Sequence, residues 1–265
     1  MKILKLYPHT DNSKRFNYNV NFGVWDKIKG DRAVVSSFNH DLNDYDVVFL
    51  PQIKRWSENP ALYERIKDHK VKKVLFDNDS CYRSFKDKIY SGIDYIFYRD
   101  TDKHKKKPPV SGSLLMWSVD TERLQPVYGG KGIAFNCSIG DYPLRKSIST
   151  FIRHSKITGD AYIHQLQHSA AAIHTDSPRV QAVRAKILEF AACGTQIISN
   201  RTSNMDLYFP DELIVYFEDT DHLKRIVHDF KPDVSVQKQL REIAVKKHDD
   251  RIRAKQVINI LKKNL

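Results

Sequence analysis

The sequence predicts an α/β protein with two open, mostly parallel β-sheets that carry helices on their faces. Short runs of β-branched and aromatic residues alternate with amphipathic helical stretches along the 265 residues. The hydrophobic share of 41% is that of a globular protein. A break at Pro108-Pro109-Val110-Ser111-Gly112 divides this pattern near its middle, because it can continue neither a helix nor a central strand.

The first half predicts one sheet. Its candidate strands are Lys2–Tyr7, Arg32–Ser36, Val47–Pro51, Lys73–Phe76 and Tyr95–Tyr98. Between them, Trp56–His69 places Leu62, Ile66 and His69 at helical spacing with charged residues in between. Helices are therefore expected to cover this sheet.

The second half repeats the plan. Its candidate strands are Leu114–Trp117, Gly132–Asn136, Ser169–His174, Thr195–Ser199 and Leu213–Phe217, and its candidate helices are Leu144–His154, Tyr162–His168, Gln181–Cys193 and His222–Phe230. The basic, amphipathic stretch Val236–Leu265 predicts one long helix that packs back across the domains.

We expect two Rossmann-like domains, residues 1–112 and 113–265, that face a cleft. Sheets of this kind bind ligands at the carboxyl ends of their strands. The first strand is followed by Tyr7-Pro8-His9-Thr10-Asp11 rather than G-x-G-x-x-G, and G-x-x-x-x-G-K-[ST] is absent from the sequence. Dinucleotide dehydrogenases and P-loop nucleotidases are therefore disfavoured.

The chain is strongly basic. Lys and Arg number 44 against 32 Asp and Glu, a net charge of +12. Residues 1–120 and 121–265 each carry 22 basic and 16 acidic side chains, or +6 apiece, so the excess belongs to both halves. This balance favours a polyanionic partner such as double-stranded DNA, and the alternative is a solvated basic surface.

Membrane and metal signals are weak. No apolar run approaches the roughly 18 residues that cross a bilayer, so we expect no membrane span. Met1–Leu6 alternates like a strand, so we expect no secretory signal there. The expected location is the cytoplasm, or the host cytoplasm if the protein is viral. Cys81, Cys137 and Cys193 have neither disulfide nor zinc-ligand spacing.

The most informative stretch is residues 184–199, RAKILEFAACGTQIIS. It predicts an amphipathic helix that ends at Gly194, where left-handed backbone geometry costs little, followed at once by a buried strand. A carboxylate such as that of Glu189 accepts hydrogen bonds from two vicinal hydroxyls, while Arg184 and Lys186 can neutralise a diphosphate.

This pattern resembles the nucleotide-sugar-binding segment of GT-B glycosyltransferases, in which a helix with a Glu runs into small residues, a Gly and a strand. Three further stretches resemble the spore-maturation-protein-like branch of that superfamily. They are Trp117-Ser118-Val119-Asp120 with Gln125-Pro126, Ile133-Ala134-Phe135-Asn136-Cys137-Ser138 with Tyr142-Pro143-Leu144-Arg145, and His248 with Arg253. The resemblance spans about residues 114–265.

The resemblance implies a GT-B hexosyltransferase that needs neither a metal nor a tightly bound cofactor and takes a UDP-sugar, such as UDP-glucose, as donor. Glu189 would hold the ribose hydroxyls. The donor-binding candidates are Glu189, Arg184, Lys186, Arg145, Ser138, Gly140, Ser203 and Asn204. The chain departs from the family where Cys137-Ser138 replaces the usual Gly, and where Gln181 replaces an acidic residue eight positions before Glu189.

An inverting transfer needs a base for the acceptor hydroxyl. Asp77 and Asp79 follow the strand Val74–Phe76 and are our catalytic candidates, and the alternative is an acidic turn that caps the next helix. Their D-x-D spacing occurs at four places in the chain, so it carries no metal prediction.

A basic loop in the first half suggests the acceptor. The candidates for DNA phosphate contact are Lys14, Arg15, Lys103, Lys105, Lys106 and Lys107. The hypothesis is transfer to a hydroxymethylated pyrimidine of duplex DNA, as in some phage enzymes, with the target base flipped out. Two alternatives are a polysaccharide, lipid-linked sugar or protein as acceptor, and a non-catalytic module that binds nucleic acid or a sugar nucleotide.

Overall fold

The computed structural model describes residues 1–7, 20–50, 60–77, 90, 92–98, 110–140, 142–175, 183, 185–202 and 204–265. The chain divides into two compact units, Met1–Met116 with Arg253–Leu265, and Trp117–Ile252. We call them unit 1 and unit 2. The division falls after Met116 rather than after residue 112, and the C-terminal segment belongs to unit 1 rather than to the second domain.

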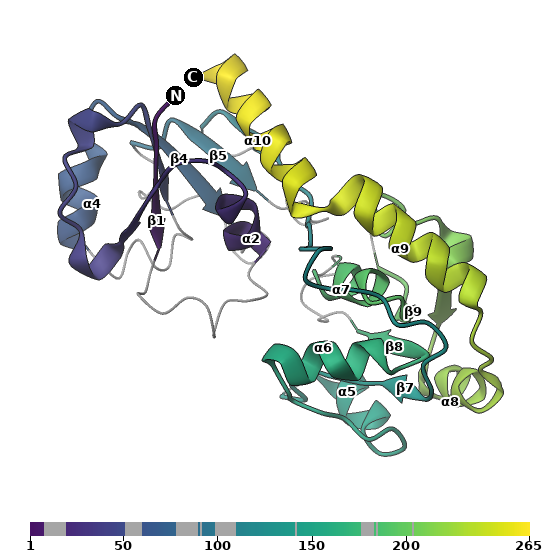
Figure 1. Ribbon diagram of the computed structural model, residues 1–265. Helices are drawn as coiled ribbons and strands as arrows, with labels where there is room; N and C mark the ends of the chain where they lie inside the picture. Colours follow the sequence, from purple (N-terminus) through teal and green to yellow (C-terminus); the bar gives the residue numbers. More distant parts are fainter. Residues whose placement is uncertain are drawn as a thin grey trace. The chain divides into compact units, whose positions relative to one another are not determined.

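Unit 1 contains a six-stranded parallel sheet with the order β2-β1-β3-β4-β5-β6 (Figure 1). The strands are β1 (Ile3–Tyr7), β2 (Asp31–Val34), β3 (Val47–Leu50), β4 (Lys72–Asp77), β5 (Tyr95–Tyr98) and β6 (Gly112–Leu114). The helices are α2 (Val20–Asp26), α4 (Pro60–Lys67) and most of α10 (Asp250–Asn264), with short 3-10 turns at Val35–Ser37 and Leu42–Asp44. Each strand predicted between residues 2 and 98 is present.

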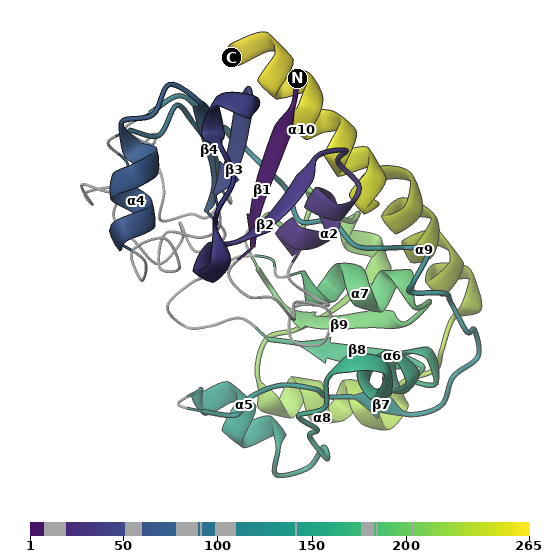
Figure 2. The same ribbon diagram turned by 60° about the vertical axis from the view of Figure 1, so that its left-hand side comes forward.

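Helices cover both faces of this sheet, because neighbouring side chains of a strand point to opposite faces. The face that carries Ile3 and Tyr7 joins α2 and α10 in one apolar cluster. The face that carries Leu4 and Leu6 joins α4 in a second cluster. Figure 2 shows α4 and α10 on opposite sides of the strands of unit 1. Such two-sided burial explains why these strands are almost continuously apolar.

A buried lysine ends α2, a helix that the sequence analysis did not predict. The Nζ of Lys5 donates hydrogen bonds to the carbonyl oxygens of Trp25 (3.0 Å) and Ile28 (2.8 Å). The last carbonyls of a helix lack partners within it, and this side chain bonds to one of them, that of Trp25, and to the Ile28 carbonyl just after α2. Burial lowers the pKa of Lys5.

Unit 2 contains a four-stranded parallel sheet with the order β10-β9-β8-β7. The strands are β7 (Ile133–Ala134), β8 (Ala171–His174), β9 (Gln196–Asn200) and β10 (Ile214–Phe217). The helices are α5 (Pro143–Ile148), α6 (Gly159–Gln167), α7 (Lys186–Ala192), α8 (Thr220–Asp229) and α9 (Val234–His248), with a 3-10 turn at Asp211–Leu213. Together with unit 1, this confirms the predicted α/β class with parallel sheets.

The junction between α7 and β9 forms as the sequence predicted. Gly194 ends the helix with φ +73°, in the left-handed region. A Cβ atom at this position would lie 2.9 Å from the ring of Tyr128. Glycine is therefore required for backbone geometry and for space, and β9 begins at Gln196.

Helix α5 is shorter than predicted, since it ends at Ile148 rather than His154. The hydroxyls of Ser149 and Thr150 donate to carbonyl oxygens three residues earlier, each at 2.7 Å. Such local bonds compete with continuation of the helix.

The chain after α5 instead pairs with the end of β7. The Ser155 amide donates to the Phe135 carbonyl (2.9 Å), and the Cys137 amide donates to the Ser155 carbonyl (3.0 Å). The side-chain amide of Asn136 donates to the carbonyl of Ile157 at 3.0 Å. Residues 153–157 therefore run beside the chain that follows β7, and these hydrogen bonds hold them there.

The strand expected at Leu114–Trp117 is also displaced, because β6 ends at Leu114. The indole N–H of Trp117 donates to the Val183 carbonyl (2.8 Å), and its backbone N–H donates to the Tyr208 hydroxyl (3.1 Å). These contacts attach Trp117 to unit 2.

The C-terminal region forms two helices, not the single helix predicted from Val236 to Leu265. Helix α9 ends at His248 and α10 begins at Asp250, while Asp249 between them is extended, with φ −66° and ψ 143°. The Val119 amide donates to the His248 carbonyl (2.9 Å), and the Asp250 amide donates to the Val119 carbonyl (3.0 Å). Contacts with Val119 thus replace helical hydrogen bonds at the break.

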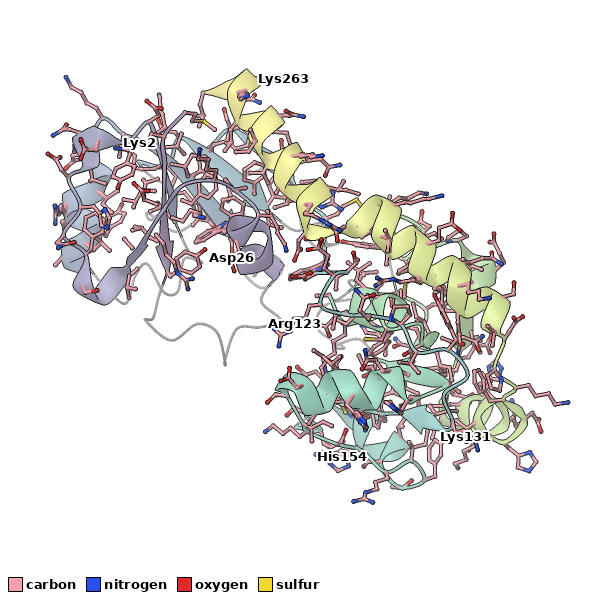
Figure 3. The ribbon with its side chains drawn as sticks, viewed as in Figure 1. Lys2, Asp26, Arg123, Lys131, His154 and Lys263 are labelled. Atoms are coloured by element: carbon pink, nitrogen blue, oxygen red, sulfur yellow. The ribbon has the colours of Figure 1, made fainter. Side chains whose placement is uncertain are left out.

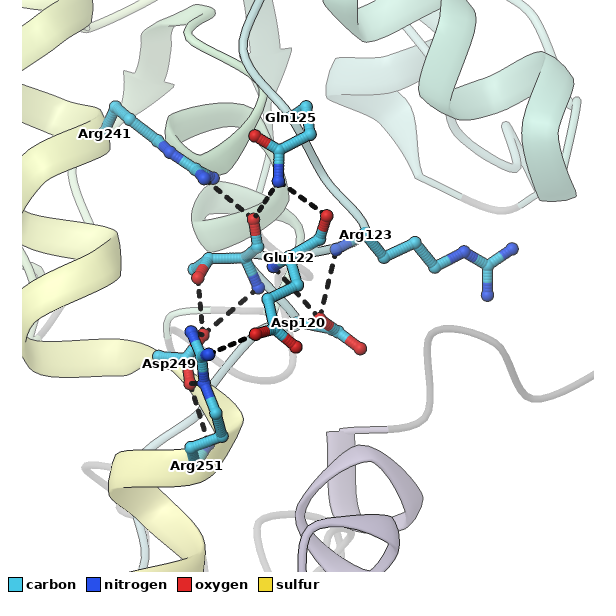
Figure 4. Close-up of polar contacts among 8 residues, drawn as sticks. Asp120, Glu122, Arg123, Gln125, Arg241, Asp249 and Arg251 are labelled. Atoms are coloured by element: carbon cyan, nitrogen blue, oxygen red, sulfur yellow. Dashed lines mark hydrogen bonds and ion pairs between the residues drawn. The ribbon is translucent and has the colours of Figure 1, made fainter.

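The Asp249 side chain also makes hydrogen bonds at this break between α9 and α10 (Figure 4). Its carboxylate is buried and accepts hydrogen bonds from the Thr121 hydroxyl (2.5 Å) and from Nε of Arg251 (2.7 Å). Arg251 also pairs with Glu122, and Arg241 donates to the Thr121 carbonyl at 2.7 Å. We call Asp249, Thr121 and Arg251 the Asp249 cluster.

The Asp249 cluster generates a stability prediction. Asp249→Asn should lower the free energy of unfolding by about 1–3 kcal/mol at pH 7, because buried hydrogen bonds to a charged group are weakened. Burial alone would raise the pKa of Asp249, but hydrogen bonds from Arg251 and Thr121 outweigh it and hold that pKa below its usual value. The measurement is urea unfolding of both proteins between pH 7 and pH 3.

The direction of the pH dependence is fixed. A carboxylate with a lowered pKa stabilises the fold above its unfolded pKa of about 4, and this contribution is lost as the pH falls through the folded value. The difference between the two proteins should therefore shrink in acid, and a difference independent of pH would contradict the account. Asp221→Asn removes an exposed pair with Lys224 and is a control expected to leave stability unchanged.

Candidate functional site

Polar side chains of unit 2 gather at the carboxyl ends of its parallel strands. His174 ends β8, and its Nδ1 lies 3.0 Å from the Ser199 hydroxyl on β9. Asn136 follows β7, and Thr175 follows β8. In a parallel α/β sheet these ends share one edge, and the helices that follow the strands begin at that edge. This is the edge at which such sheets bind ligands.

Glu189 is a charged residue within a buried helix. The residues Ile187–Ala192 of α7 are all buried, and Glu189 is 5% exposed. The hydroxyl of Tyr162, on α6 and 4% exposed, donates to its Oε2 at 2.8 Å. Burial raises the pKa of Glu189, while the Tyr162 hydrogen bond and the Lys186 charge act against this rise.

Lys186 begins α7, one helical turn before Glu189. Its Nζ donates to the carbonyl oxygen of Asn136 at 2.7 Å and lies 5.7 Å from the ring centroid of Tyr162. Burial lowers the pKa of Lys186, and the charge of Glu189 acts in the opposite direction. The α7 N-terminus therefore carries an anion and a cation beside the end of β7.

Arg145, on α5, joins the segments that follow two strands. Its Nε donates to the Thr175 hydroxyl (2.8 Å), Nη2 to the Thr175 carbonyl (3.1 Å) and Nη1 to the Ser138 carbonyl (3.0 Å). Its guanidinium carbon lies 4.2 Å from the ring centroid of Tyr142. Burial raises the pKa of the Cys137 thiol, and the charges of Arg145 and Lys186 oppose this rise. The positive charges of Arg145 and Lys186 therefore both reach the Cys137 thiol.

Two predicted donor residues have left-handed backbones. Gly140 has φ +46°, and Asn204, in the loop after β9, has φ +64°. The Asn204 Nδ2 is buried, and in the part of the chain that the structure describes it has no hydrogen-bond partner. A buried amide donor without an acceptor is unfavourable, so an acceptor oxygen from a ligand would stabilise this loop.

The structure thus brings Glu189, Lys186, Arg145 and Ser138 together at one edge of unit 2. Several predicted residues lie outside the described residues, namely Arg184, Ser203, Asp79, Lys14, Arg15, Lys103, Lys105, Lys106 and Lys107. Their contacts stay predictions.

Asp77 ends β4 in unit 1, as the sequence predicted. It is 1% exposed, and the Tyr90 hydroxyl donates to its Oδ2 at 3.0 Å. Its carboxylate is therefore buried and held by a hydrogen bond. A base must come within hydrogen-bond reach of the hydroxyl that it deprotonates.

Unit 2 carries exposed basic side chains that the sequence analysis did not single out. From Tyr142 to Gly159 the chain carries four Lys or Arg residues and no Asp or Glu. Lys146, Arg153, His154 and Lys156 are exposed, and within the described ranges none of them makes an ion pair. We call these four residues the basic edge. Figure 3 marks His154 on unit 2.

Neither a cluster of metal ligands nor a membrane-spanning helix occurs among the described residues. Within the described ranges, no three or more His, Cys, Asp and Glu side chains lie close enough together to hold a metal ion. In the same part of the chain, no helix combines the length and apolar composition needed to span a bilayer.

Comparison with known proteins identifies the family. Residues 121–259, just over half of the chain, match the family model described as glycosyl transferase-like. The chain belongs to the glycosyl transferase-like family. The matched region contains α7 with Glu189 and the other polar residues of the sheet edge. No curated protein matches the sequence of this glycosyl transferase-like protein.

Solved structures show the fold of this glycosyl transferase-like protein to be GT-B. The T4 phage β-glucosyltransferase is 12% identical, with a TM-score of 0.68 over 100% of this chain and 99% of that one. Anabaena HepE, solved with UDP and glucose, is 9% identical, with a TM-score of 0.69 over 99% and 100%. A glycosyltransferase from Rickettsia africae is 10% identical, with a TM-score of 0.63 over 99% and 98%. The GT-B prediction is confirmed.

The sequence found the carboxylate but missed its partner. Tyr162 lies 27 positions from Glu189, on another helix, so no local motif links the two. The signal in the sequence was a tyrosine on the apolar stripe of α6 with Ile163 and Leu166. A buried tyrosine hydroxyl usually has a hydrogen-bond partner, which pointed to a polar group nearby without naming it.

The geometry of Arg145 generates a prediction for this family member. Arg145→Lys keeps the charge but loses the planar fork that bonds to both Ser138 and Thr175. Amide hydrogen exchange of peptides that contain these two residues should therefore accelerate about fivefold or more, the effect of losing roughly 1 kcal/mol. Lys146→Arg, on the same helix and exposed, is the matched control and should leave exchange unchanged. Equal exchange in Arg145→Lys and the parent protein would contradict the assigned role.

Proposed function

We propose that this protein transfers a hexose from a UDP-sugar, with UDP-glucose as the first choice, to a hydroxyl acceptor. The observation that carries the donor assignment is the buried carboxylate of Glu189 at the carboxyl edge of the unit 2 sheet. Two structural neighbours support the choice of donor, since HepE was solved with UDP and glucose and the T4 enzyme with UDP-glucose. Motifs around Trp117 and His248 favour the spore-maturation-protein-like branch.

In this proposal Glu189 accepts hydrogen bonds from the two vicinal ribose hydroxyls. Lys186, Arg145 and Arg184 supply positive charge for the diphosphate. Among the described residues, Lys186 uses one of its three N–H groups and Arg145 uses three of its five, which leaves donors for phosphate oxygens. The amide of Asn204, with Ser203, Ser138 and Gly140, completes the donor-binding loops.

The reaction forms a bond between the acceptor oxygen and the anomeric carbon as the bond from that carbon to the diphosphate breaks. UDP leaves with the bonding electrons, and the cations named above stabilise its charge without a metal. The proton of the acceptor hydroxyl goes to a carboxylate, for which we propose Asp77 or Asp79. The burial of Asp77 against Tyr90 favours Asp79 for direct contact with the acceptor.

For the acceptor we propose a hydroxymethylated pyrimidine in double-stranded DNA. The net charge of +12 and the basic edge of unit 2 support a polyanionic acceptor. One structural neighbour is described as a DNA-modifying β-glucosyltransferase. The lysines at residues 103–107, with Lys14 and Arg15, would add phosphate contacts from the first half. Such a function belongs in the cytoplasm, where DNA is present, or in the host cytoplasm for a viral protein.

The donor site generates the first functional prediction. Glu189→Ala should weaken UDP binding by about 1–3 kcal/mol, because charge-assisted hydrogen bonds to the ribose are lost. Isothermal titration calorimetry with UDP measures this, and Glu189→Gln repeats it with the side-chain volume retained. Glu242→Ala, an exposed residue on α9, is the matched control and should bind UDP normally. Unchanged affinity in both Glu189 variants would refute the donor assignment.

The acceptor generates a second prediction. With UDP-[14C]glucose, label should pass to duplex DNA that contains hydroxymethylated pyrimidines and not to unmodified DNA. Transfer only to a glycan, lipid-linked sugar or protein would show that DNA is not the acceptor. Tight UDP binding without transfer would indicate a non-catalytic module. Asp79→Asn should abolish transfer while leaving UDP affinity unchanged.

DNA binding measured at several salt concentrations tests the basic edge. Replacement of Lys146, Arg153 and Lys156 by Glu should weaken DNA binding. It should also make the negative slope of log K against log salt shallower by about 2–3, at roughly 0.9 per phosphate contact. Affinity for UDP should not change. Reversal of Lys255, Lys262 and Lys263 on α10 alters the net charge equally and is the control. Equal losses in both triple variants would show a general charge effect instead.

A further inference from the structure

The hydrogen bond between Tyr162 and Glu189 joins two buried side chains from different helices. Tyr162 lies on α6 and Glu189 on α7, and the distance from the hydroxyl to Oε2 is 2.8 Å. Both side chains are at least nine-tenths buried. A phenylalanine ring would fill almost the same volume. The contribution of the Tyr162 hydroxyl is therefore its hydrogen bonding, including the bond to Glu189.

This bond sets the orientation of the carboxylate. An ionised carboxylate has two oxygens and about four lone-pair positions. Tyr162 occupies one position on Oε2 and thereby restricts rotation of the group. Among the described residues, the hydrogen bond of the Lys186 Nζ goes to the Asn136 carbonyl, at 2.7 Å, rather than to Glu189. A neutral donor holds the carboxylate in place without cancelling its charge.

The same bond affects ionisation. Burial favours the protonated form of Glu189, which could donate one hydrogen bond but would lose acceptor capacity. A hydroxyl that donates to the charged form stabilises that form, and the nearby Lys186 charge adds to this. The ionised group accepts from two vicinal hydroxyls through charge-assisted hydrogen bonds, which are stronger than those that the protonated group can accept.

We propose that Tyr162 is a positioning residue, which keeps Glu189 oriented and ionised so that it recognises the cis-diol of a ribonucleotide donor. This inference rests on the proposed role of Glu189 as the ribose-binding group. It adds that discrimination between a ribonucleotide and a 2′-deoxyribonucleotide depends on the Tyr162 hydroxyl, a group that does not itself touch the nucleotide.

The experiment compares UDP and 2′-deoxy-UDP binding to the full chain by calorimetry between pH 5 and pH 8. The parent protein should prefer UDP by about tenfold or more, the effect of one charge-assisted hydrogen bond. Tyr162→Phe should reduce this preference about fivefold while affinity for 2′-deoxy-UDP changes little. The preference should also disappear at a higher pH in Tyr162→Phe, because removal of the hydrogen bond raises the pKa of Glu189.

Controls separate this inference from the proposed function. Tyr45→Phe removes another tyrosine–carboxylate bond, to Asp31 in unit 1, and should leave both affinities unchanged. Glu189→Gln should lose the preference for UDP, and if it keeps that preference the ribose-binding role itself fails. If Glu189→Gln loses the preference but Tyr162→Phe keeps it with an unshifted pH profile, only the inference about Tyr162 fails.

A purely structural role gives a different result. If Tyr162→Phe weakens UDP and 2′-deoxy-UDP binding by the same factor, Tyr162 supports the fold and does not position Glu189. Thermal unfolding of each variant checks that it is folded. Should Tyr162→Phe not fold, Tyr162→Leu provides the same comparison of UDP with 2′-deoxy-UDP, and an unchanged preference in that variant overturns the proposal.

Discussion

A carboxylate buried inside an apolar helix is the constraint on which the functional account depends. Helix α7 is covered from Ile187 to Ala192, and Glu189 is the charged side chain within that stretch. Burying a charge is unfavourable unless it is paired and hydrogen-bonded. The Tyr162 hydroxyl supplies the hydrogen bond, and the nearby charge of Lys186 opposes the rise in the pKa of Glu189 that burial causes. A helix with a purely structural role does not need such a group, and its place beside the carboxyl edge of the sheet is the reason for the functional role that we propose for it.

The cations at this edge are held by neutral groups rather than by carboxylates. Lys186 donates to a backbone carbonyl, and Arg145 donates to two carbonyls and a hydroxyl. Their positive charge is therefore positioned without being neutralised at those contacts. Such an arrangement attracts an anion to the place where the strands end, and a diphosphate beside a ribose fits the alternation of cation and carboxylate. The glycosyl transferase-like family and the GT-B fold agree with this chemistry.

Local patterns predicted most elements of the fold, and contacts between distant residues account for what they missed. Strands such as β5 and the junction from α7 through Gly194 to β9 follow from short-range apolar patterning and one glycine. The break between α9 and α10 depends on Asp249 and Thr121, which lie 128 positions apart. The helical periodicity of the sequence does not contain this contact, and it therefore predicted one continuous helix. Likewise, Glu189 was visible in a motif, whereas Tyr162 belongs to the site only through the packing of α6 on α7.

The most direct test of the account is a crystal structure of the protein with UDP-glucose. The account predicts that the ribose hydroxyls lie within hydrogen-bond distance of the Glu189 carboxylate, with the diphosphate near Lys186 and Arg145. A structure in which the nucleotide binds elsewhere, or in which Glu189 stays covered and does not contact the ribose, would contradict it.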